Sequence, residues 1–330
     1  MKISIFILNF NNSKLTIECI DSLLKSVTNH EIFIYLLDNG SNETEVNLLK
    51  NYVSTIISPT KINFTTYYSN VNLGFSKGNN YLIRKSELDN EFDYYILLNN
   101  DTVVMENSID NLVNFSINNN ADATSGTILE YDTKDLIWYS GGHINKIRAK
   151  GVHHYYGKSF RKIKLKSKKT LFLSGCYVLF SRNCLYSLGL LNESYFFGTE
   201  EYDFSIKLRK LGFRMFFCRE SIIYHKVSIS KGHGSSHEVK ELIFKYNSIR
   251  NKYIFLISNL TFINKSHILL IFLLLLKTIY YKNNFEILNK AYRKKLFNLF
   301  IKSFLRYSRN YYIDFSEFES VRKSFLKIYD

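Results

Sequence analysis

Short apolar runs that alternate with helical segments are the most constraining feature of the first hundred residues. Four runs have the length and composition of buried strands: 3–9, 31–38, 62–69 and 93–98. Three segments between them have the apolar spacing of amphipathic helices: 14–27, 43–54 and 76–86. This order of strand and helix predicts a doubly wound α/β domain, with a mostly parallel central sheet flanked by helices.

Polar clusters follow three of these runs at the point where each predicted strand ends. Asn9 ends the first run, Asp38 and Asn39 follow the second, and the segment 99–101 (Asn-Asn-Asp) follows the fourth. In such sheets the ligand crevice lies outside the carboxyl ends of the strands. We therefore expect the functional site at these three strand ends.

Strand-like sequence continues through 121–182 and contains a strongly basic stretch. Residues 146–169 hold ten Lys and Arg and no acid. Such a stretch is either a solvated loop or a contact for the phosphates of a substrate or a lipid. Segment 171–180 is predicted to be a buried strand, and 213–218 a short one.

The composition changes at about residue 240, which predicts one domain over 1–240 and a helical C-terminal region over 241–330. Residues 265–330 carry 13 Lys and Arg against five acids. Basic residues mixed with Phe, Leu and Tyr suit a surface that docks on anionic lipid, and a helical dimerisation element is the alternative. The apolar block 268–276 has nine residues, about half of what a bilayer span needs.

The formal charge of +15 predicts an anionic partner: nucleic acid, a nucleotide or a membrane surface. No nucleic-acid-binding module is visible, so we expect no nucleic-acid partner. The four cysteines form no CxxC pair and are predicted to be buried and reduced. The first apolar run is too short for a signal peptide, so we expect a cytoplasmic protein, at the inner face of the cell membrane.

The sequence lacks the familiar phosphate-binding motifs, both the P-loop and the dinucleotide G-x-G-x-x-G after a strand. Two histidine pairs, 153–154 and 233 with 237, lie in polar surroundings and are predicted to be surface residues. Asp101 could present a carboxylate to Mg²⁺ or Mn²⁺, although an Asn/Asp turn is the simpler explanation.

Three acids in four residues begin the predicted helix 200–211. Acids in a first turn complement the helix dipole, but Glu200, Glu201 and Asp203 together exceed what that needs. They are therefore candidates for acid–base chemistry.

An ordered set of short motifs resembles the family 2 glycosyltransferases, especially the rhamnosyltransferase-like bacterial branch that builds surface polysaccharides. The matching segments cover roughly residues 1–255: 7–11 (ILNFN), 37–41 (LDNGS), 72–80 (NLGFSKGNN), 97–101 (LLNND), 174–176 (SGC), 180–182 (FSR), 196–203 (FFGTEEYD), 225–228 (HKVS) and 246–251 (YNSIRN). The resemblance implies the GT-A fold, a Rossmann-like sheet flanked by helices, here with a C-terminal helical appendage.

The resemblance also implies roles for individual residues. Asp38 would contact the nucleotide base, and Asp101 would hold the metal from the last position of an Asp-x-Asp-type motif whose first position is here Asn99. His225 would be a further metal or diphosphate ligand. The remaining implied donor-binding residues are Asn9, Asn72, Lys77 and Asn100.

In the resembling enzymes the second acid of a Glu-Asp-x-Asp pattern is the catalytic base, and that position here is Glu201. Glu200 and Asp203 remain alternatives. Arg209, on the same predicted helix, would support the acids.

The implied reaction is inverting transfer of a sugar from a dTDP- or UDP-linked donor to a hydroxyl of a glycan or lipid-linked acceptor. One carboxylate takes the acceptor proton, and Mg²⁺ or Mn²⁺ offsets the charge of the departing nucleoside diphosphate. A sugar-phosphate nucleotidyltransferase is an alternative, but it needs a Gly-rich basic loop where this chain has 9–13 (NFNNS). An inactive homologue that serves as an assembly scaffold is another, against which Asp101, Glu201 and His225 argue.

Overall fold

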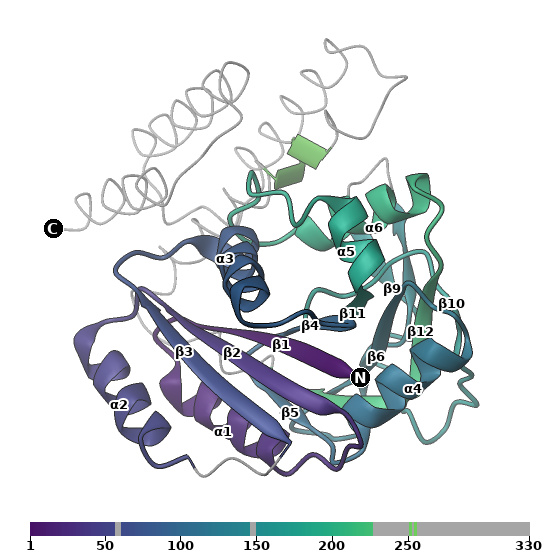
Figure 1. Cartoon of the computed structure of the whole chain (residues 1–330). Coiled ribbons are helices and arrows are strands. Elements are labelled where there is room, and N and C mark those ends of the chain that lie inside the picture. The colour runs from purple at the N-terminus through teal and green to yellow at the C-terminus, as the bar shows by residue number, and fades with distance from the viewer. Residues whose placement is uncertain (57–60, 146–149, 227–250, 253, 256–330) are drawn as a thin grey trace, which may run out of the picture.

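The computed structural model describes residues 1–56, 61–145, 150–226, 251–252 and 254–255. These residues form an α/β domain with a central sheet of ten strands and helices on both faces (Figure 1). Almost all of the predicted C-terminal region, its basic segment 265–330, the apolar block 268–276 and the histidines at 233 and 237 lie outside the described residues. No helix of the described part is long and apolar enough to cross a membrane.

The first hundred residues confirm the predicted alternation. The elements are β1 (Lys2–Asn9), α1 (Ser13–Leu24), β2 (Glu31–Asn39), α2 (Glu43–Val53), β3 (Ile62–Ser69), α3 (Gly74–Asp89) and β4 (Tyr94–Leu98). Strands β3, β2, β1 and β4 are neighbours in that order, and all pair in parallel.

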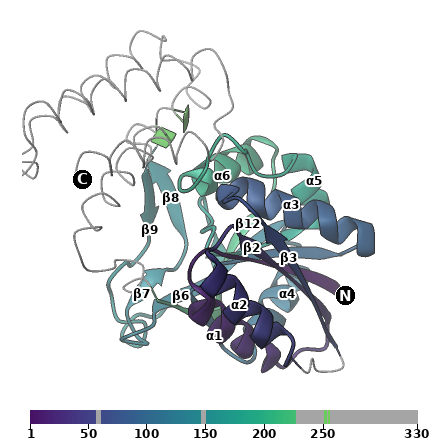
Figure 2. The ribbon, with the colours of Figure 1, turned by 90° about the vertical axis from the view of Figure 1, so that its left-hand side faces the viewer.

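The second half makes the sheet mixed. Its elements are β5 (Thr102–Val104), α4 (Ser108–Asn118), β6 (Ala123–Glu130), β7 (Ile137–Tyr139), β8 (Gly142–Asn145), β9 (Lys150–His153), β10 (Lys168–Lys169), β11 (Tyr177–Ser181), α5 (Arg182–Leu188), α6 (Glu200–Lys210) and β12 (Met215–His225). Strand β11 lies antiparallel between β4 and β6, and β12 runs parallel to β6. Figure 2 shows the separate β8–β9 hairpin standing off the main sheet.

Side chains of alternate strand residues build two cores, one on each face of the sheet. On β1, Ile3, Ile5 and Ile7 pack with α1, α2 and α4, whereas Phe6 packs with α3, α5 and α6 on the other face. This is the period of two that a pleated strand imposes. Each fully buried Ile or Phe contributes about 1.5–3 kcal/mol, so both helix layers are held firmly.

Two local predictions are wrong. Residues 171–176 are not a strand, because Tyr139 Oη donates to the carbonyl of Phe172 (2.7 Å) and the amide of Leu173 donates to Ser205 Oγ (3.1 Å). Side chains thus replace the ladder hydrogen bonds of this buried segment. The predicted short strand 213–218 is instead one long strand, β12, whose pairing with β6 shifts between Cys218 and Ile222.

The sheet brings the predicted site residues to one edge. Strands β1, β2, β3, β4, β6 and β12 share one direction, so their carboxyl ends lie together. His225 ends β12 and so lies at the same edge as the ends of β1, β2 and β4. The crevice outside this edge is where doubly wound sheets bind ligands.

Candidate active site

A network of amides and hydroxyls joins the ends of β1 and β2. The side-chain amide of Asn9 donates to Asp38 Oδ2 (2.8 Å), and the backbone amide of Ser41 donates to Asp38 Oδ1 (3.0 Å). Thr16 Oγ1 donates to Asn9 Oδ1 (2.7 Å). Asn9 and Asp38 are both fully buried, so in this structure they fix the loop after β2, and contact of Asp38 with a base requires that loop to move.

Asn39 ties the end of β2 to the segment before α3, a role that sequence reasoning missed. Its Nδ2 donates to Asn72 Oδ1 (3.1 Å), and its Oδ1 accepts from the amide of Leu73 (2.8 Å). The next residue, Gly74, has φ 76°, and a Cβ there would lie 2.4 Å from the carbonyl oxygen of Phe196. Only glycine allows this approach. Lys77 lies in the first turn of α3, partly buried.

The segment after β4 is anchored to its neighbours through its polar groups. The amide of Asn99 donates to the carbonyl of Cys176 (2.9 Å), and Asn100 Nδ2 donates to Thr16 Oγ1 (2.8 Å). Thr16 therefore links Asn100 to the Asn9 network. The hydrogen bonds of Asn99 and Asn100 thus hold the turn that precedes Asp101.

Asp101 and His225 are brought together at the sheet edge. His225 Nε2 lies 3.2 Å from Asp101 Oδ1, and both side chains are largely buried. Asp101 Oδ1 and His225 Nδ1 are nevertheless buried without a hydrogen-bond partner within the described residues. An unsatisfied buried carboxylate oxygen beside an imidazole fits a divalent cation. The described ranges hold no group of three or more His, Cys, Asp or Glu side chains that could hold a metal ion.

Lys226 is a second missed residue of this part of the site. It is 3% exposed and forms an ion pair with Glu18 on α1, and its ammonium lies 4.6 Å from the ring centre of Tyr131. Its backbone amide donates to the carbonyl of Asp101 (2.9 Å). Lys226 therefore ties the backbone at Asp101 to α1 through its ion pair with Glu18. The sequence held one signal for Lys226, which is a charged residue directly after an apolar strand.

Aromatic rings support His225 from the other side. Its ring centre lies 4.8 Å from that of Trp138, edge to face, and Trp138 makes the same contact with His153. The prediction of surface histidines is wrong for His153, whose Nδ1 donates to the Trp138 carbonyl (2.7 Å) and whose ring stacks on Phe172. Burial lowers the pKa of His153. It also lowers the pKa of His154, which is less exposed than predicted. A neutral hairpin histidine therefore backs the Trp138 ring.

The acids of α6 follow a strained turn. Gly198 and Thr199 both have φ 81°, and for a β-branched residue such as Thr199 this is an outlier worth about 1–3 kcal/mol. The turn is held from outside by Asn251, a fully buried residue whose Nδ2 donates to the carbonyls of Phe197 (2.8 Å) and Gly198. Strain is thus concentrated directly before Glu200.

Glu200 and Glu201 differ in surroundings. Glu200 is 5% exposed, and its Oε2 is buried without a hydrogen-bond partner in the described structure. Burial, followed by the charge of Glu201, holds the pKa of Glu200 well above its ordinary value. Glu201 is partly exposed, and burial raises its pKa as well. Of the two acids, Glu200 is the more deeply buried and has the more strongly raised pKa.

Cys176 lies between the two groups of acids. A Cβ on the preceding Gly175 would lie 3.7 Å from Glu201 Cβ, and Cys176 bonds to Asn99 through its carbonyl. Burial raises the pKa of the Cys176 thiol, and the charges of Asp101 and Glu201 add to the effect. The structure thus brings α6 and the end of β4 to the same site. All four cysteines are free and buried, which confirms that prediction.

Asp203 and Arg209 lie away from this pair. Asp203 accepts from Tyr195 Oη (3.4 Å) and Asn192 Nδ2 (3.5 Å), so its carboxylate holds the loop before α6. Arg209 is exposed in the last turn of α6, and eight helical residues separate it from Glu201 by about 12 Å along the axis. Direct support of the acids by Arg209 is therefore ruled out.

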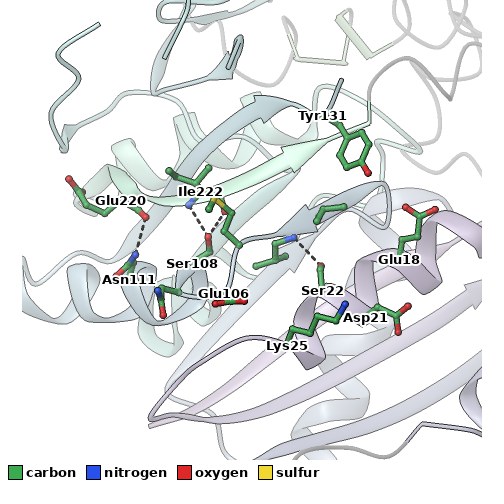
Figure 3. Close-up of a pocket in the computed structure, with 14 residues that line it drawn as sticks. Glu18, Asp21, Ser22, Lys25, Glu106, Ser108, Asn111, Tyr131, Glu220 and Ile222 are labelled. Atoms are coloured by element: carbon green, nitrogen blue, oxygen red, sulfur yellow. Dashed lines mark hydrogen bonds between the residues drawn. The ribbon is translucent and has the colours of Figure 1, made fainter. Parts of the chain in front are cut away.

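A groove of about 640 Å³ lies beside the site rather than in it. It runs between α1, β5, the start of α4 and β12, and Glu18, Ser22, Ser108 and Tyr131 are among the residues that line it (Figure 3). None of the predicted site residues lines this groove. Its link to the site is indirect, because Glu18 and Tyr131 are the partners of Lys226.

Comparisons with solved structures agree on the fold. Staphylococcus aureus TarS 1-349 in complex with UDP is 16% identical, with a TM-score of 0.51 over 99% of this chain and 92% of that one. Mannosyltransferase PcManGT from Pyrobaculum calidifontis in complex with GDP-Man and Mn²⁺ is 11% identical, with a TM-score of 0.52 over 93% and 88%. GalNAc-T7 with UDP, GalNAc and Mn²⁺ is 16% identical, with a TM-score of 0.51 over 68% of this chain but only 43% of its own length.

The family follows from the sequence itself. No curated protein matches this chain by sequence. The family model of glycosyl transferase family 2, however, matches residues 4–189, more than half of the chain and the part that carries β1 to β4 and β11. This chain therefore belongs to glycosyl transferase family 2 and has the GT-A fold.

Proposed function

We propose that the protein transfers a sugar from a nucleoside-diphosphate sugar to a hydroxyl group, with inversion and with the help of a divalent metal. The observation that carries the proposal is the juxtaposition at the sheet edge of His225 Nε2 and Asp101 Oδ1, 3.2 Å apart, where this buried carboxylate oxygen has no hydrogen-bond partner in the described residues. Family membership supports glycosyl transfer as the reaction.

The donor would lie along the ends of β1, β2 and β4. Asn9, Asp38, Asn72, Lys77, Asn99 and Asn100 would bind it or hold the loops that do so. Solved structures of this fold contain UDP, UDP-GlcNAc or GDP-Man, which supports a nucleotide sugar as the donor. We expect a UDP- or dTDP-linked sugar.

Asp101 and His225 would hold Mg²⁺ or Mn²⁺, and Mn²⁺ occurs in two of the similar structures. When bound, the ion supplies positive charge to the departing diphosphate. Lys226, whose backbone amide binds the Asp101 carbonyl, would add a positive charge that its ion pair with Glu18 holds in place. Trp138 orients the His225 ring by edge-to-face contact.

Glu201 would act as the base. An ionised carboxylate with a raised pKa takes a proton from an acceptor hydroxyl more readily than an ordinary one. Removal of that proton during a single in-line displacement gives inversion at the sugar carbon. Glu200, which is buried and has a strongly raised pKa, and Asp203, which accepts a hydrogen bond from Tyr195, are the less favoured alternatives.

The wider setting is also a proposal. We expect the acceptor to be a glycan or lipid-linked glycan in bacterial surface polysaccharide synthesis (capsule or O-antigen), at the inner face of the cell membrane. Residues 1–240 would form the catalytic domain, and 241–330 a helical region that contacts membrane or forms a homodimer. A sugar-phosphate nucleotidyltransferase and an inactive scaffold remain the competing functions.

A panel of nucleotide sugars, with and without Mn²⁺, tests the proposal. We expect one donor to raise the melting temperature only with the metal, and the corresponding nucleoside diphosphate to be released when an acceptor is present. Release of pyrophosphate from a nucleoside triphosphate and a sugar phosphate would identify a nucleotidyltransferase instead. Stabilisation without turnover on any acceptor would favour the scaffold.

A further inference from the structure

A ridge of exposed cations flanks the sheet beyond β12. We define the basic ridge as residues 161–169, whose six cations are all exposed: Arg161, Lys162, Lys164, Lys166, Lys168 and Lys169. The ridge contains no acid. Alternate residues therefore carry charge on the outside of one short segment.

The ridge is anchored and is not a free loop. Phe160, Ile163 and Leu165 point inward and pack with Leu129 and Ile137 in a small apolar cluster. The segment thus has one apolar side and one cationic side. The apolar side anchors the segment to the domain, which a solvated loop would not be.

Hydrogen bonds reinforce this anchoring at both ends. The amide of Arg161 donates to Asp135 Oδ1 (3.0 Å). Ser167 Oγ donates to Glu220 Oε2 (2.6 Å) and accepts from the amide of Arg219 (2.8 Å). The last two residues of the ridge form β10, paired with β12. The neighbouring acids Asp135 and Glu220 thus accept hydrogen bonds from the Arg161 amide and from Ser167.

The charges around the ridge leave a positive excess. Asp135 lies 3.9 Å from the Arg161 guanidinium, which is 82% exposed, so this pair is loose. Glu220 is shared between Ser167 and Arg219, itself a cation. Two neighbouring acids therefore face seven cations, the six of the ridge and Arg219.

Exposed aromatic and aliphatic groups lie directly beside these cations along the chain. Tyr155 and Tyr156 are 47% and 58% exposed, and Leu171 is 47% exposed. The Lys168 ammonium lies 5.7 Å from the Tyr155 ring centre. Membrane-surface contacts combine Tyr side chains at the level of the lipid headgroups with Lys side chains that attract anionic lipid. Binding of a soluble polyanion needs only the cations.

We propose that the basic ridge, together with Tyr155, Tyr156 and Leu171, docks the protein on an anionic lipid bilayer. The partner is the bilayer surface, independent of the C-terminal region. Docking on the bilayer would bring the protein to a lipid-linked acceptor, and only this consequence rests on the proposed function. Lipid binding itself is measured without any sugar donor.

Vesicle co-sedimentation of the full chain tests this proposal. The probes are vesicles of phosphatidylcholine with and without phosphatidylglycerol. We expect binding only with the anionic lipid, weakened by salt. The triple variant Lys162→Gln, Lys164→Gln and Lys166→Gln should lose about 100-fold in partitioning, at about fivefold for each cation. Its far-UV spectrum and donor-induced stabilisation should match those of the wild type.

A charge-matched variant is the control. Lys14, Lys50 and Lys61 are also exposed, and they lie on α1, on α2 and directly before β3, which is at the opposite edge of the sheet from β10. Their replacement by Gln should leave partitioning within about fivefold of the wild type, the effect of one cation near the surface. Equal losses in the two triple variants would show that only net charge matters and would overturn the proposal. So would binding to soluble polyphosphate without binding to vesicles. Donor turnover is unaffected by either result, so failure here leaves the proposed function standing.

Discussion

Glutamine replacement of the two adjacent acids of α6 separates their roles. Glu201→Gln removes the carboxylate that would take the acceptor proton, and a positioned general base typically contributes 10²–10⁴-fold. We expect kcat to fall by about 100- to 10,000-fold, which corresponds to about 2.7–5.5 kcal/mol of barrier. Donor binding should change little, because Glu201 lies on the side of Cys176 away from Asp101.

Glu200→Gln should behave in the opposite way. Burial holds the pKa of the Glu200 carboxyl well above the ordinary 4.5, which favours its protonated form, and Gln copies the shape and charge of that form. We expect kcat to stay within about tenfold of the wild type, about 1.4 kcal/mol. Initial rates of nucleoside diphosphate release, at saturating donor, measure both variants.

The raised pKa of Glu200 also predicts how the free energy of unfolding changes with pH. Below pH 4.5 the folded and unfolded chains both keep this proton, so the group adds no pH dependence. Above it the unfolded chain ionises while the native one does not, so the wild type loses up to about 1.4 kcal/mol for each pH unit until the raised pKa is reached. Glu200→Gln lacks this loss, and its advantage in urea unfolding should grow with pH.

The two variants also have a refuting outcome. Transfer that survives Glu201→Gln and disappears in Glu200→Gln would exchange the roles of the two acids. A stability gap between Glu200→Gln and wild type that does not change with pH would mean that Glu200 is ionised in the native state. Either result contradicts the reasoning from burial.

Three further predictions follow from single contacts. Trp138 is the only tryptophan and touches His225, so Mn²⁺ with donor should quench its fluorescence, and Asp101→Asn should abolish this quenching; quenching that persists would place the metal elsewhere. Gly74→Ala should cost more than 2 kcal/mol in urea unfolding, because φ is positive and the Cβ would lie 2.4 Å from a carbonyl oxygen, whereas Gly157→Ala, with open space, should cost only about 1–2; equal costs would remove the steric argument. Burial raises the pKa of Cys19 to about 12, so the native protein should resist thiol reagents until urea unfolds it, and rapid native labelling would contradict the structure.

Periodicity and strand ends were enough to predict which polar residues meet at one edge of the sheet. Strands buried on both faces keep apolar runs, and their polar ends stand out, so Asn9, Asp38 and Asp101 could be found from the chain alone. The parallel half of the sheet then brings these ends together by topology. Local sequence sufficed because each residue's position follows from its own strand.

Residues whose neighbours come from distant parts of the chain could not be found in this way. Lys226 meets Glu18 across 208 positions, and Asn251 reaches the turn before α6 across more than fifty. The run 171–176 looked like a strand because its side chains are apolar, but Tyr139 and Ser205 bind its backbone. Sequence pattern reports burial, and it does not report which groups satisfy a buried backbone.

The spacing between Asp101, the proposed metal ligand, and Glu201, the proposed base, is set by two strands of opposite direction. Asp101 follows β4, and Cys176 precedes β11, which pairs with β4 from Tyr177 opposite Leu98 onward. The Asn99 amide bonds to Cys176 (2.9 Å), and Gly175 packs next to Glu201. A slip of one residue in this pairing would move the two acids by about 3.3 Å and turn alternate side chains of β11 to the wrong face. The fully buried side chains of β11 on both faces oppose that slip, so the same packing that stabilises the sheet also fixes the distance over which a sugar must pass from donor to acceptor.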